Sequence, residues 1–167
     1  MFSIAIQDAN ILIDCAAIGL LDAVFQLPCA FKTSDFIWAE ITDEAQRQMI
    51  QPYIDSSQLT IATFTAAEVL RIAALLQTHN GVSFEDCSAL YLAQLHRATL
   101  LTGDGKLRKV CRSVQVPVPG TLWLLDEVYD RGILRAAEAC TKIRSLQALN
   151  PRLPQDALEL RVQRWCG

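Results

Sequence analysis

Short apolar runs alternate along this chain with longer stretches of helical period, and this alternation limits the possible folds more than any other feature of the sequence. Runs of strand length occupy residues 3–7, 31–33, 58–63 and 99–102. Each run is followed by a segment whose apolar residues recur with the period of a helix. Strands that alternate with helices form a parallel sheet covered by helices. We therefore expect an α/β fold with a central parallel sheet.

The segments between these runs predict the covering helices. Helical sequence follows the first run through Leu27, and the helix after the second run carries Ile37, Trp38, Ile41 and Ala45 on one face. Further helices are expected over residues 66–77, where His79-Asn80-Gly81 follows as a stop signal, and over residues 83–96 and 104–112.

The last part of the chain predicts one more strand and then helices only. Residues 114–118 are apolar enough for a strand, and Pro117 and Pro119 suit a sheet edge or a strand end. Two or three helices follow, interrupted at 150–154 by two prolines. The last helix is expected to be amphipathic through Leu158, Leu160, Val162 and Trp165.

Chain length and composition fit one domain with one hydrophobic core. The chain has 167 residues, of which 51% are hydrophobic and 20% are charged. We expect a single domain over residues 1–167, with a core over about 3–135 and a helical extension over about 136–167. The extension has three possible roles: packing on the core, dimerisation, or contact with a peptide of a partner protein.

Membrane insertion and secretion are not expected. Charged or polar residues interrupt every apolar run before it reaches the roughly 20 residues of a membrane span. The first residues, MFSIAIQDANILID, lack the basic start of a secretory signal and contain Asp8 within the apolar stretch. We therefore expect a cytoplasmic protein. The net charge of −3 argues against a protein that coats nucleic acid non-specifically.

The six cysteines are widely scattered and form no CxxC pair. We expect reduced and mostly buried thiols, because most of them lie in apolar or helical surroundings. The only histidines are His79 and His96, so a structural zinc site lacks its usual ligands. Any metal ion is expected to bind through oxygen atoms.

Four acidic residues are placed to meet at one edge of the predicted sheet. Asp8 directly follows the first strand, and Asp104 comes two residues after Thr102. Glu40 lies about a turn and a half into the helix after the second strand, and Asp86 lies in the first turn of the helix that starts at Ser83. Ligands of open parallel sheets bind at the carboxyl ends of the strands. The four side chains are therefore expected to converge there.

A group of four carboxylates without basic partners needs a cation to stay ionised. Mg²⁺ or Mn²⁺ suits such a site, since both prefer oxygen ligands and keep several waters. Each acid also has a structural interpretation when taken alone. Asp8 suits a helix cap, Glu40 a solvated helix position, Asp86 a capping box with Ser83, and Asp104 a turn before a glycine. The metal-site hypothesis depends on the four together.

The segments around these acids resemble the motifs of PIN-domain proteins, a fold of many toxin ribonucleases in toxin–antitoxin pairs. QDANILID resembles the first motif, TSDFIWAEI the second with Glu40 as its acid, and SFEDCSALYLAQLHRATLLTGDGKLRK the joined third and fourth with Asp86 and Asp104. GTLWLLDEVYDRG resembles a segment of one branch of the family. The likeness spans about residues 3–135.

This resemblance implies a three-layer α/β/α sandwich, dependence on Mg²⁺ or Mn²⁺, and hydrolysis of RNA that leaves a 5′-phosphate. Asp8, Asp86 and Asp104 would bind the metal, and Glu40 would bind it or orient the attacking water. Asn10 and Thr102 would position carboxylates by hydrogen bonds. Homodimers and inhibitory protein partners are common in the family. Gly103 and Lys106 depart from the usual pattern, which implies a weaker second metal site.

Four basic residues follow the fourth acid and form a candidate grip on RNA phosphates: Lys106, Arg108, Lys109 and Arg112. A solvated helix face is the structural alternative. The alternative function is a PIN-like protein that binds a partner without meaningful catalysis. An aspartyl-nucleophile hydrolase would need a second Asp where Asn10 stands, and glycine-rich nucleotide-binding loops are absent from the sequence.

Overall fold

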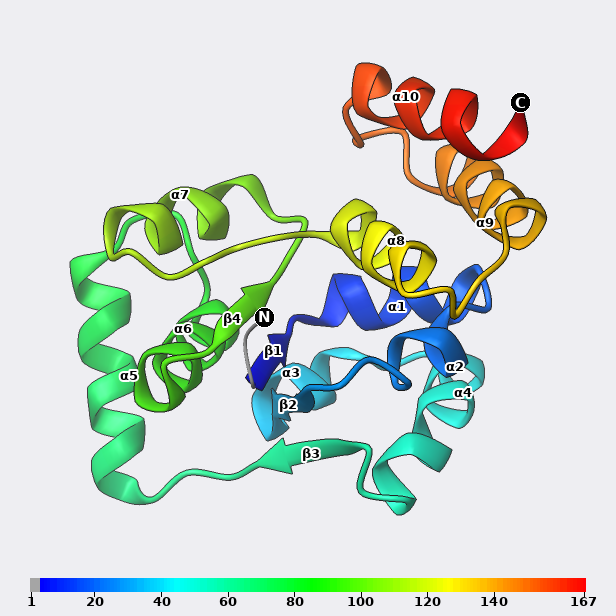
Figure 1. Cartoon of the computed structure of the whole chain (residues 1–167). Coiled ribbons are helices and arrows are strands. Elements are labelled where there is room, and N and C mark those ends of the chain that lie inside the picture. The colour runs from blue at the N-terminus through cyan, green and yellow to red at the C-terminus, as the bar shows by residue number, and fades with distance from the viewer. Residues whose placement is uncertain (1–3) are drawn as a thin grey trace.

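A computed structural model describes residues 4–167, and its centre is a four-stranded, fully parallel sheet with the strand order β3-β2-β1-β4 (Figure 1). The strands are β1 (Ile4–Gln7), β2 (Ala30–Ser34), β3 (Leu59–Ala62) and β4 (Thr99–Leu101). The expected α/β fold with a parallel sheet is confirmed. Ser3, which was expected to open the first strand, lies outside the described residues.

The register places β1 in the middle of the sheet. Ala5 lies opposite Phe31 of β2 on one side and opposite Thr99 of β4 on the other. The amide N–H of Asp8 continues the pairing with β4 by donating to the carbonyl of Leu101 at 3.1 Å. Because all four strands run in one direction, their carboxyl ends share one edge of the sheet, and Asp8 lies on it.

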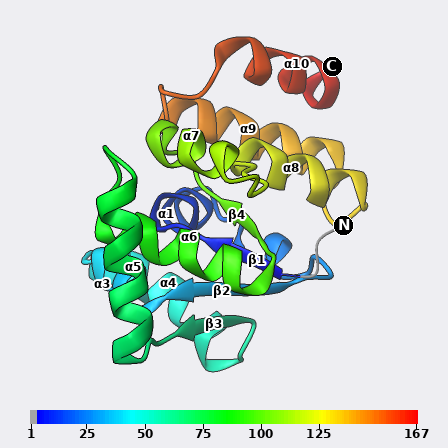
Figure 2. The same cartoon turned by 90° about the vertical axis from the view of Figure 1, so that its left-hand side faces the viewer.

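Ten helices accompany this sheet within residues 4–167 (Figures 1 and 2). Their bounds are α1 (Ala9–Ala17), α2 (Leu21–Val24), α3 (Asp35–Glu40), α4 (Glu44–Asp55), α5 (Ala66–Thr78), α6 (Phe84–His96), α7 (Gly105–Ser113), α8 (Thr121–Asp130), α9 (Ala136–Leu149) and α10 (Gln155–Cys166).

Two contacts from β2 show that helical elements cover both faces of the sheet. The hydroxyls of Ser34 and Ser88 of α6 share a buried hydrogen bond of 2.7 Å. Phe31 instead packs edge-on against Phe25, which follows α2 and stacks on Tyr53 of α4. Residues three apart on a strand point to opposite faces. The sheet is therefore the middle layer of three.

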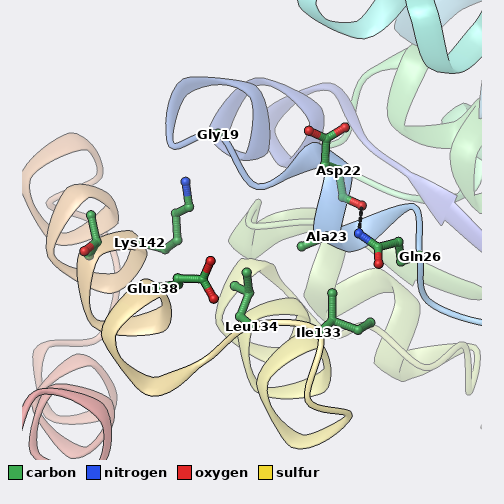
Figure 3. A pocket seen from close by; sticks show the side chains of 9 residues that line it. Gly19, Asp22, Ala23, Gln26, Ile133, Leu134, Glu138 and Lys142 are labelled. Atoms are coloured by element: carbon green, nitrogen blue, oxygen red, sulfur yellow. Dashed lines mark hydrogen bonds between the residues drawn. The ribbon is translucent and has the colours of Figure 1, made fainter.

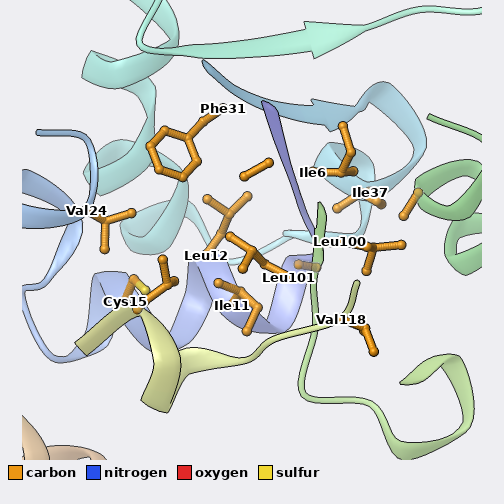
Figure 4. Close-up of a cluster of buried hydrophobic side chains, with 14 of the residues drawn as sticks. Ile6, Ile11, Leu12, Cys15, Val24, Phe31, Ile37, Leu100, Leu101 and Val118 are labelled. Carbon is orange, nitrogen blue, oxygen red and sulfur yellow. The ribbon is translucent and has the colours of Figure 1, made fainter. Parts of the chain in front are cut away.

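Branched aliphatic side chains fill the core between β1, β4 and α1 (Figure 4). Ile6, Ile11, Leu12, Leu100 and Leu101 have no solvent exposure. Strands buried on both faces are apolar at consecutive positions, and the Leu100-Leu101 pair follows that rule. This packing fixes the carboxyl ends of β1 and β4, and so the positions of Asp8 and Thr102, which directly follow these strands.

The single helix expected after the second strand is instead two helices. α3 ends at Glu40 and α4 begins at Glu44, because Asp43 caps α4 by accepting a 2.9 Å hydrogen bond from the amide of Gln46. The break allows Arg47 of α4 to reach back to α3, where it donates to the carbonyls of Trp38 and Ile41.

The prediction of a strand at residues 114–118 is wrong. This segment runs beside β4 and accepts bonds from it, from the amide of Leu100 to Pro117 at 2.9 Å and from the amide of Thr102 to Pro119 at 3.2 Å. Proline has no N–H, so neither Pro117 nor Pro119 donates a bond in return. The pairing is one-sided, and no strand forms.

The C-terminal helices confirm the expected extension and its break, but they correct two details. α9 and α10 flank the break at 150–154, and a disulfide joins Cys140 to Cys166. The expectation of six reduced thiols is therefore wrong for this pair, which the close packing of the two helices brings together. Leu160 is 66% exposed, so it does not belong to the buried face that Leu158 and Trp165 form.

The other four cysteines are free, as expected, and three of them are buried: Cys15, Cys87 and Cys111. Burial raises the pKa of the Cys111 thiol to about 11, so this thiol stays protonated at neutral pH. In the described part of the chain, no helix has both the length and the apolar character that crossing a membrane requires.

Candidate active site

The structure brings the four predicted acids together around one pocket at the carboxyl edge of the sheet. The pocket has a volume of about 310 Å³. Its lining residues come from four separate segments: Asp8, Ala9, Asn10, Ile13, Glu40, Asp86 and Asp104. Ala9 and Ile13 form an apolar wall that could not be singled out from the sequence, because both look like ordinary apolar positions of a helix.

Asp8 is the most buried of the acids, with 4% of its surface exposed. It is the N-cap of α1, and its Oδ1 accepts a 2.8 Å bond from the amide of Ala9. Its Oδ2 accepts two more bonds, at 2.9 Å from Nδ2 of Asn10 and at 2.6 Å from the hydroxyl of Thr102. Three donors therefore fix this carboxylate in one orientation.

Thr102 and Asn10 join the ends of β1 and β4. The hydroxyl of Thr102 also accepts a 3.0 Å bond from the amide of Asp104. Oδ1 of Asn10 accepts a 3.1 Å bond from the amide of Gly103. Both residues make the kind of contact that was expected of them, since each orients a carboxylate or the backbone beside one.

Asp86 and Asp104 each use one oxygen for a helix N-terminus. Oδ2 of Asp86 accepts from the amide of Ser83 at 2.8 Å, which completes a capping box in α6. Oδ1 of Asp104 accepts from the amide of Leu107 at 2.8 Å, as the N-cap of α7. Neither of these two hydrogen bonds uses the other oxygen of its carboxylate, and both side chains line the pocket. The cap and the ligand interpretations are therefore compatible.

Glu40 is the last residue of α3 and lies at the exposed rim of the pocket. Arg47 supports the turn that carries it: Nη1 donates to the carbonyl of Ile41 at 2.9 Å, and the guanidinium lies 4.3 Å from the centre of the Trp38 ring. Arg47 was not expected at the site. The sequence offers little to indicate this role, because Arg47 lies seven residues after Glu40 and beyond a helix break that was not predicted.

The pocket is electrostatically strained without a cation. Partial loss of hydration at the rim of the pocket, followed by the nearby charges of Asp8, Glu85 and Asp86, raises the pKa of Glu40 to about 7. Burial also raises the pKa of Asp8 and of Asp86, and the charge of Asp104 adds to both shifts. No basic side chain of the described residues forms an ion pair with any of the four acids. Positive charge from outside the chain would relieve this repulsion.

An all-oxygen donor set of this kind fits Mg²⁺ or Mn²⁺. Within residues 4–167, no three His, Cys, Asp or Glu side chains lie close enough together to hold one ion directly. Mg²⁺ usually keeps several waters and binds through only one or two carboxylates. The pocket has room for such waters, so the remaining acids would be reached through them.

The four basic residues that were candidates for gripping RNA are divided by the fold. Lys106, Lys109 and Arg112 are exposed on α7. Arg108 is half-buried and turns toward the sheet, where its Nη1 donates to the carbonyl of Thr102 at 3.0 Å. The free charges on this helix therefore belong to the other three residues.

A second cavity, of about 390 Å³, lies at the other end of α1 (Figure 3). Gly19, Ala23, Ile133 and Leu134 line it together with the polar side chains of Asp22, Gln26, Glu138, Thr141 and Lys142. It contains one cation and two carboxylates but none of the predicted site residues.

The fold and the site define a class of protein: a parallel α/β sheet with four carboxylates around one pocket at its carboxyl edge. The chain matches the model of a family described as PIN domain (DUF3368) over residues 4–166, and it belongs to that family. PIN domains are typically ribonucleases and typically bind Mg²⁺. The resemblance seen in the sequence motifs is confirmed.

One solved structure with the same fold is that of PAE2754 from Pyrobaculum aerophilum, with a TM-score of 0.52 and 18% identity. The match covers 75% of this chain and 89% of that one. At this identity the likeness concerns the fold alone. No curated protein matches the chain.

Proposed function

We propose that this protein is a metal-dependent endoribonuclease that hydrolyses RNA phosphodiester bonds at the acidic pocket. The observation that carries the proposal is the meeting of Asp8, Glu40, Asp86 and Asp104 around one cavity without a basic partner. Membership of a family whose members are typically ribonucleases supports RNA as the substrate.

In this proposal Asp8, Asp86 and Asp104 hold Mg²⁺ or Mn²⁺, directly or through water. A cation bound there would lower the pKa of a water molecule and neutralise charge on the phosphate. Glu40 lies at the rim, has no hydrogen-bond donor within residues 4–167, and has its pKa raised to about 7. It is suited to orient the attacking water and to take its proton.

The biological setting belongs to the proposal as well. We propose a toxin of a toxin–antitoxin pair, inhibited by a protein partner, acting as a homodimer in the cytoplasm. The Cys140–Cys166 disulfide weighs against the cytoplasmic location, because disulfides are rare in cytoplasmic proteins. Purification together with the product of a neighbouring gene, followed by identification of any bound protein, tests the partner and the oligomeric state.

The decisive experiment compares wild type with Asp8→Asn on labelled single-stranded RNA in the presence of Mn²⁺. The matched control is Asp43→Asn, because Asp43 is also an N-cap aspartate but caps α4 outside the pocket. We expect wild type and Asp43→Asn to cleave and Asp8→Asn to lose cleavage. A folded wild type that is free of inhibitor and leaves RNA intact with Mn²⁺ would contradict the proposal.

The alternative function is a PIN-like binding module without meaningful catalysis. It is favoured by the absence, in the described chain, of three acids close enough to chelate an ion directly. Under this alternative, Mn²⁺ would neither bind in the pocket nor support cleavage, while a protein partner would bind wild type and Asp8→Asn equally.

A further inference from the structure

We propose that Arg108 is a positioning residue of the acidic pocket: by binding the carbonyl of Thr102, it holds the end of β4 that aligns Asp8 and Asp104. This inference rests on the proposed function, because it assigns a role in cation binding and catalysis. It also replaces the phosphate-gripping role that the sequence suggested for Arg108.

The first argument is the edge position of β4. Its outer edge bonds to the segment that contains Pro117 and Pro119, which accept from the amides of Leu100 and Thr102. In this parallel pairing, Pro119 lacks the N–H that would return a bond to the carbonyl of Leu100. The residue aligned to return one to the carbonyl of Thr102 is Thr121, which already begins α8, and no backbone amide of the described residues bonds to that carbonyl. A backbone carbonyl left unpaired in a protein interior is costly. Arg108 supplies the missing donor at the residue that needs it, with Nη1 3.0 Å from the carbonyl of Thr102.

The second argument is what Thr102 does with its other groups. Its hydroxyl donates to Oδ2 of Asp8 at 2.6 Å and accepts from the amide of Asp104 at 3.0 Å. A shift of the Thr102 backbone would therefore move or release both acids together. Arg108 touches neither carboxylate, so it acts on them only through Thr102.

The third argument is the tight space around the guanidinium. A Cβ added at Gly120 would lie 3.3 Å from Nη1 of Arg108 and 3.4 Å from the carbonyl oxygen of Thr102. Gly120 therefore lets the chain pass close over this hydrogen bond before α8 begins. Burial lowers the pKa of Arg108, with Arg112 adding to the shift, as expected for a guanidinium turned inward rather than toward a solvated phosphate.

The test measures Mn²⁺ affinity by calorimetry on the full chain without RNA, and kcat and KM for RNA at several salt concentrations. Arg108→Leu should weaken Mn²⁺ binding and lower kcat, each by roughly 10-fold to 100-fold, the range found when a residue supporting a metal ligand is removed. KM and its salt dependence should stay close to those of wild type.

Lys109→Leu is the matched control, since it removes an exposed cation from the next position of α7. It should leave Mn²⁺ affinity unchanged. If Lys109 contacts a phosphate, its removal raises KM and lowers the salt slope by about one unit. The same pattern in Arg108→Leu, with Mn²⁺ affinity unchanged, would overturn the inference and restore the phosphate-gripping role.

Gly120→Val is a second test that leaves the charge of Arg108 in place. The valine side chain would crowd the hydrogen bond between Arg108 and the carbonyl of Thr102. Gly120→Val should weaken Mn²⁺ binding, as Arg108→Leu should. If circular dichroism shows that Arg108→Leu does not fold, the inference is tested with Gly120→Val instead. Full Mn²⁺ affinity in a folded Gly120→Val variant with Arg108 displaced would overturn the inference. A wild type that binds Mn²⁺ without cleaving RNA removes the proposed ribonuclease but leaves this affinity comparison decisive.

Discussion

The hydroxyl of Thr102 donates a 2.6 Å hydrogen bond to Oδ2 of Asp8, across 94 positions of the sequence. Both groups are buried, and the bond joins the residue after β4 to the residue after β1. Asp8 has the most restricted orientation of the four acids because of it. The acidic pocket thus depends on the pairing of two neighbouring strands.

Replacing Thr102 by Val should weaken this pocket, while Thr102→Ser should not. Valine keeps the volume but loses the donor to Asp8 and the acceptor for the amide of Asp104. Leaving buried polar groups unpaired costs about 1–3 kcal/mol, so denaturant unfolding should show a loss of that size for Thr102→Val. Mn²⁺ affinity should fall with it. Equal affinity in the Val and Ser variants would contradict the positioning role of the hydroxyl.

Asp86→Asn should separate the capping role of this residue from its ligand role. An amide oxygen still accepts from the amide of Ser83, so the unfolding free energy should stay within about 1 kcal/mol of wild type. Mn²⁺ affinity should fall at least about tenfold, because a charged ligand is lost. Glu68→Gln is the matched control: Glu68 holds the corresponding capping-box position in α5, outside the pocket. Its Mn²⁺ affinity should equal that of wild type.

The metal-free protein should become more stable as the pH falls from about 7 toward 5. The pKa of Glu40 is raised to about 7, so in this range the folded state binds a proton that the unfolded state has released. The pKa values of Asp8 and Asp86 are shifted in the same direction. Stability from these groups is present at low pH and is lost as the pH rises through the folded pKa.

Denaturant unfolding in EDTA at pH 5, 6, 7 and 8 measures this dependence. Glu40→Gln should flatten it, because the amide does not titrate. Adding Mg²⁺ or Mn²⁺ should stabilise wild type most at the highest pH, where the acids are ionised. A wild type whose pH dependence matches that of Glu40→Gln would refute the raised pKa of Glu40.

Reduction of the Cys140–Cys166 disulfide should destabilise the C-terminal helices without altering the pocket. The bond links α9 to α10, and bonds of this kind contribute about 2–4 kcal/mol. α10 keeps its ion pairs from Arg161 to Asp126 and from Arg164 to Asp130 on α8. Unfolding with and without a reducing thiol measures the loss. Hydrogen exchange should locate the loosened amides in α10, and Mn²⁺ affinity should be unchanged.

The Cys140→Ser/Cys166→Ser double variant controls for the thiol reagent, since it should match the reduced wild type. Cys111→Ser should leave the effect of the reductant intact, because Cys111 is free and buried. A reductant effect that persists in the double variant would show that the stability loss has another cause.

The sequence determined the sheet and the identity of the pocket acids for a local reason. Runs such as Leu100-Leu101 and the helical periods beside them are fixed by the burial of neighbouring residues, which is readable along the chain. Parallel strands in alternation with helices then place Asp8 and Asp104 at one edge. Thr102 and Asn10 were anticipated from the resemblance to the family motifs, which contain them beside two of these acids.

Only the tertiary structure decided which polar side chains and cysteines contact one another. Arg108 looked like a free cation, but no backbone amide of the segment beside β4 bonds to the carbonyl of Thr102, and Arg108 donates to it instead. Arg47 reached α3 because Asp43 began a new helix, and Cys140 met Cys166 because α9 and α10 pack together. None of these contacts follows from the local pattern of apolar and polar residues. Local pattern sets the elements, whereas the partner of each polar group is settled when the elements pack.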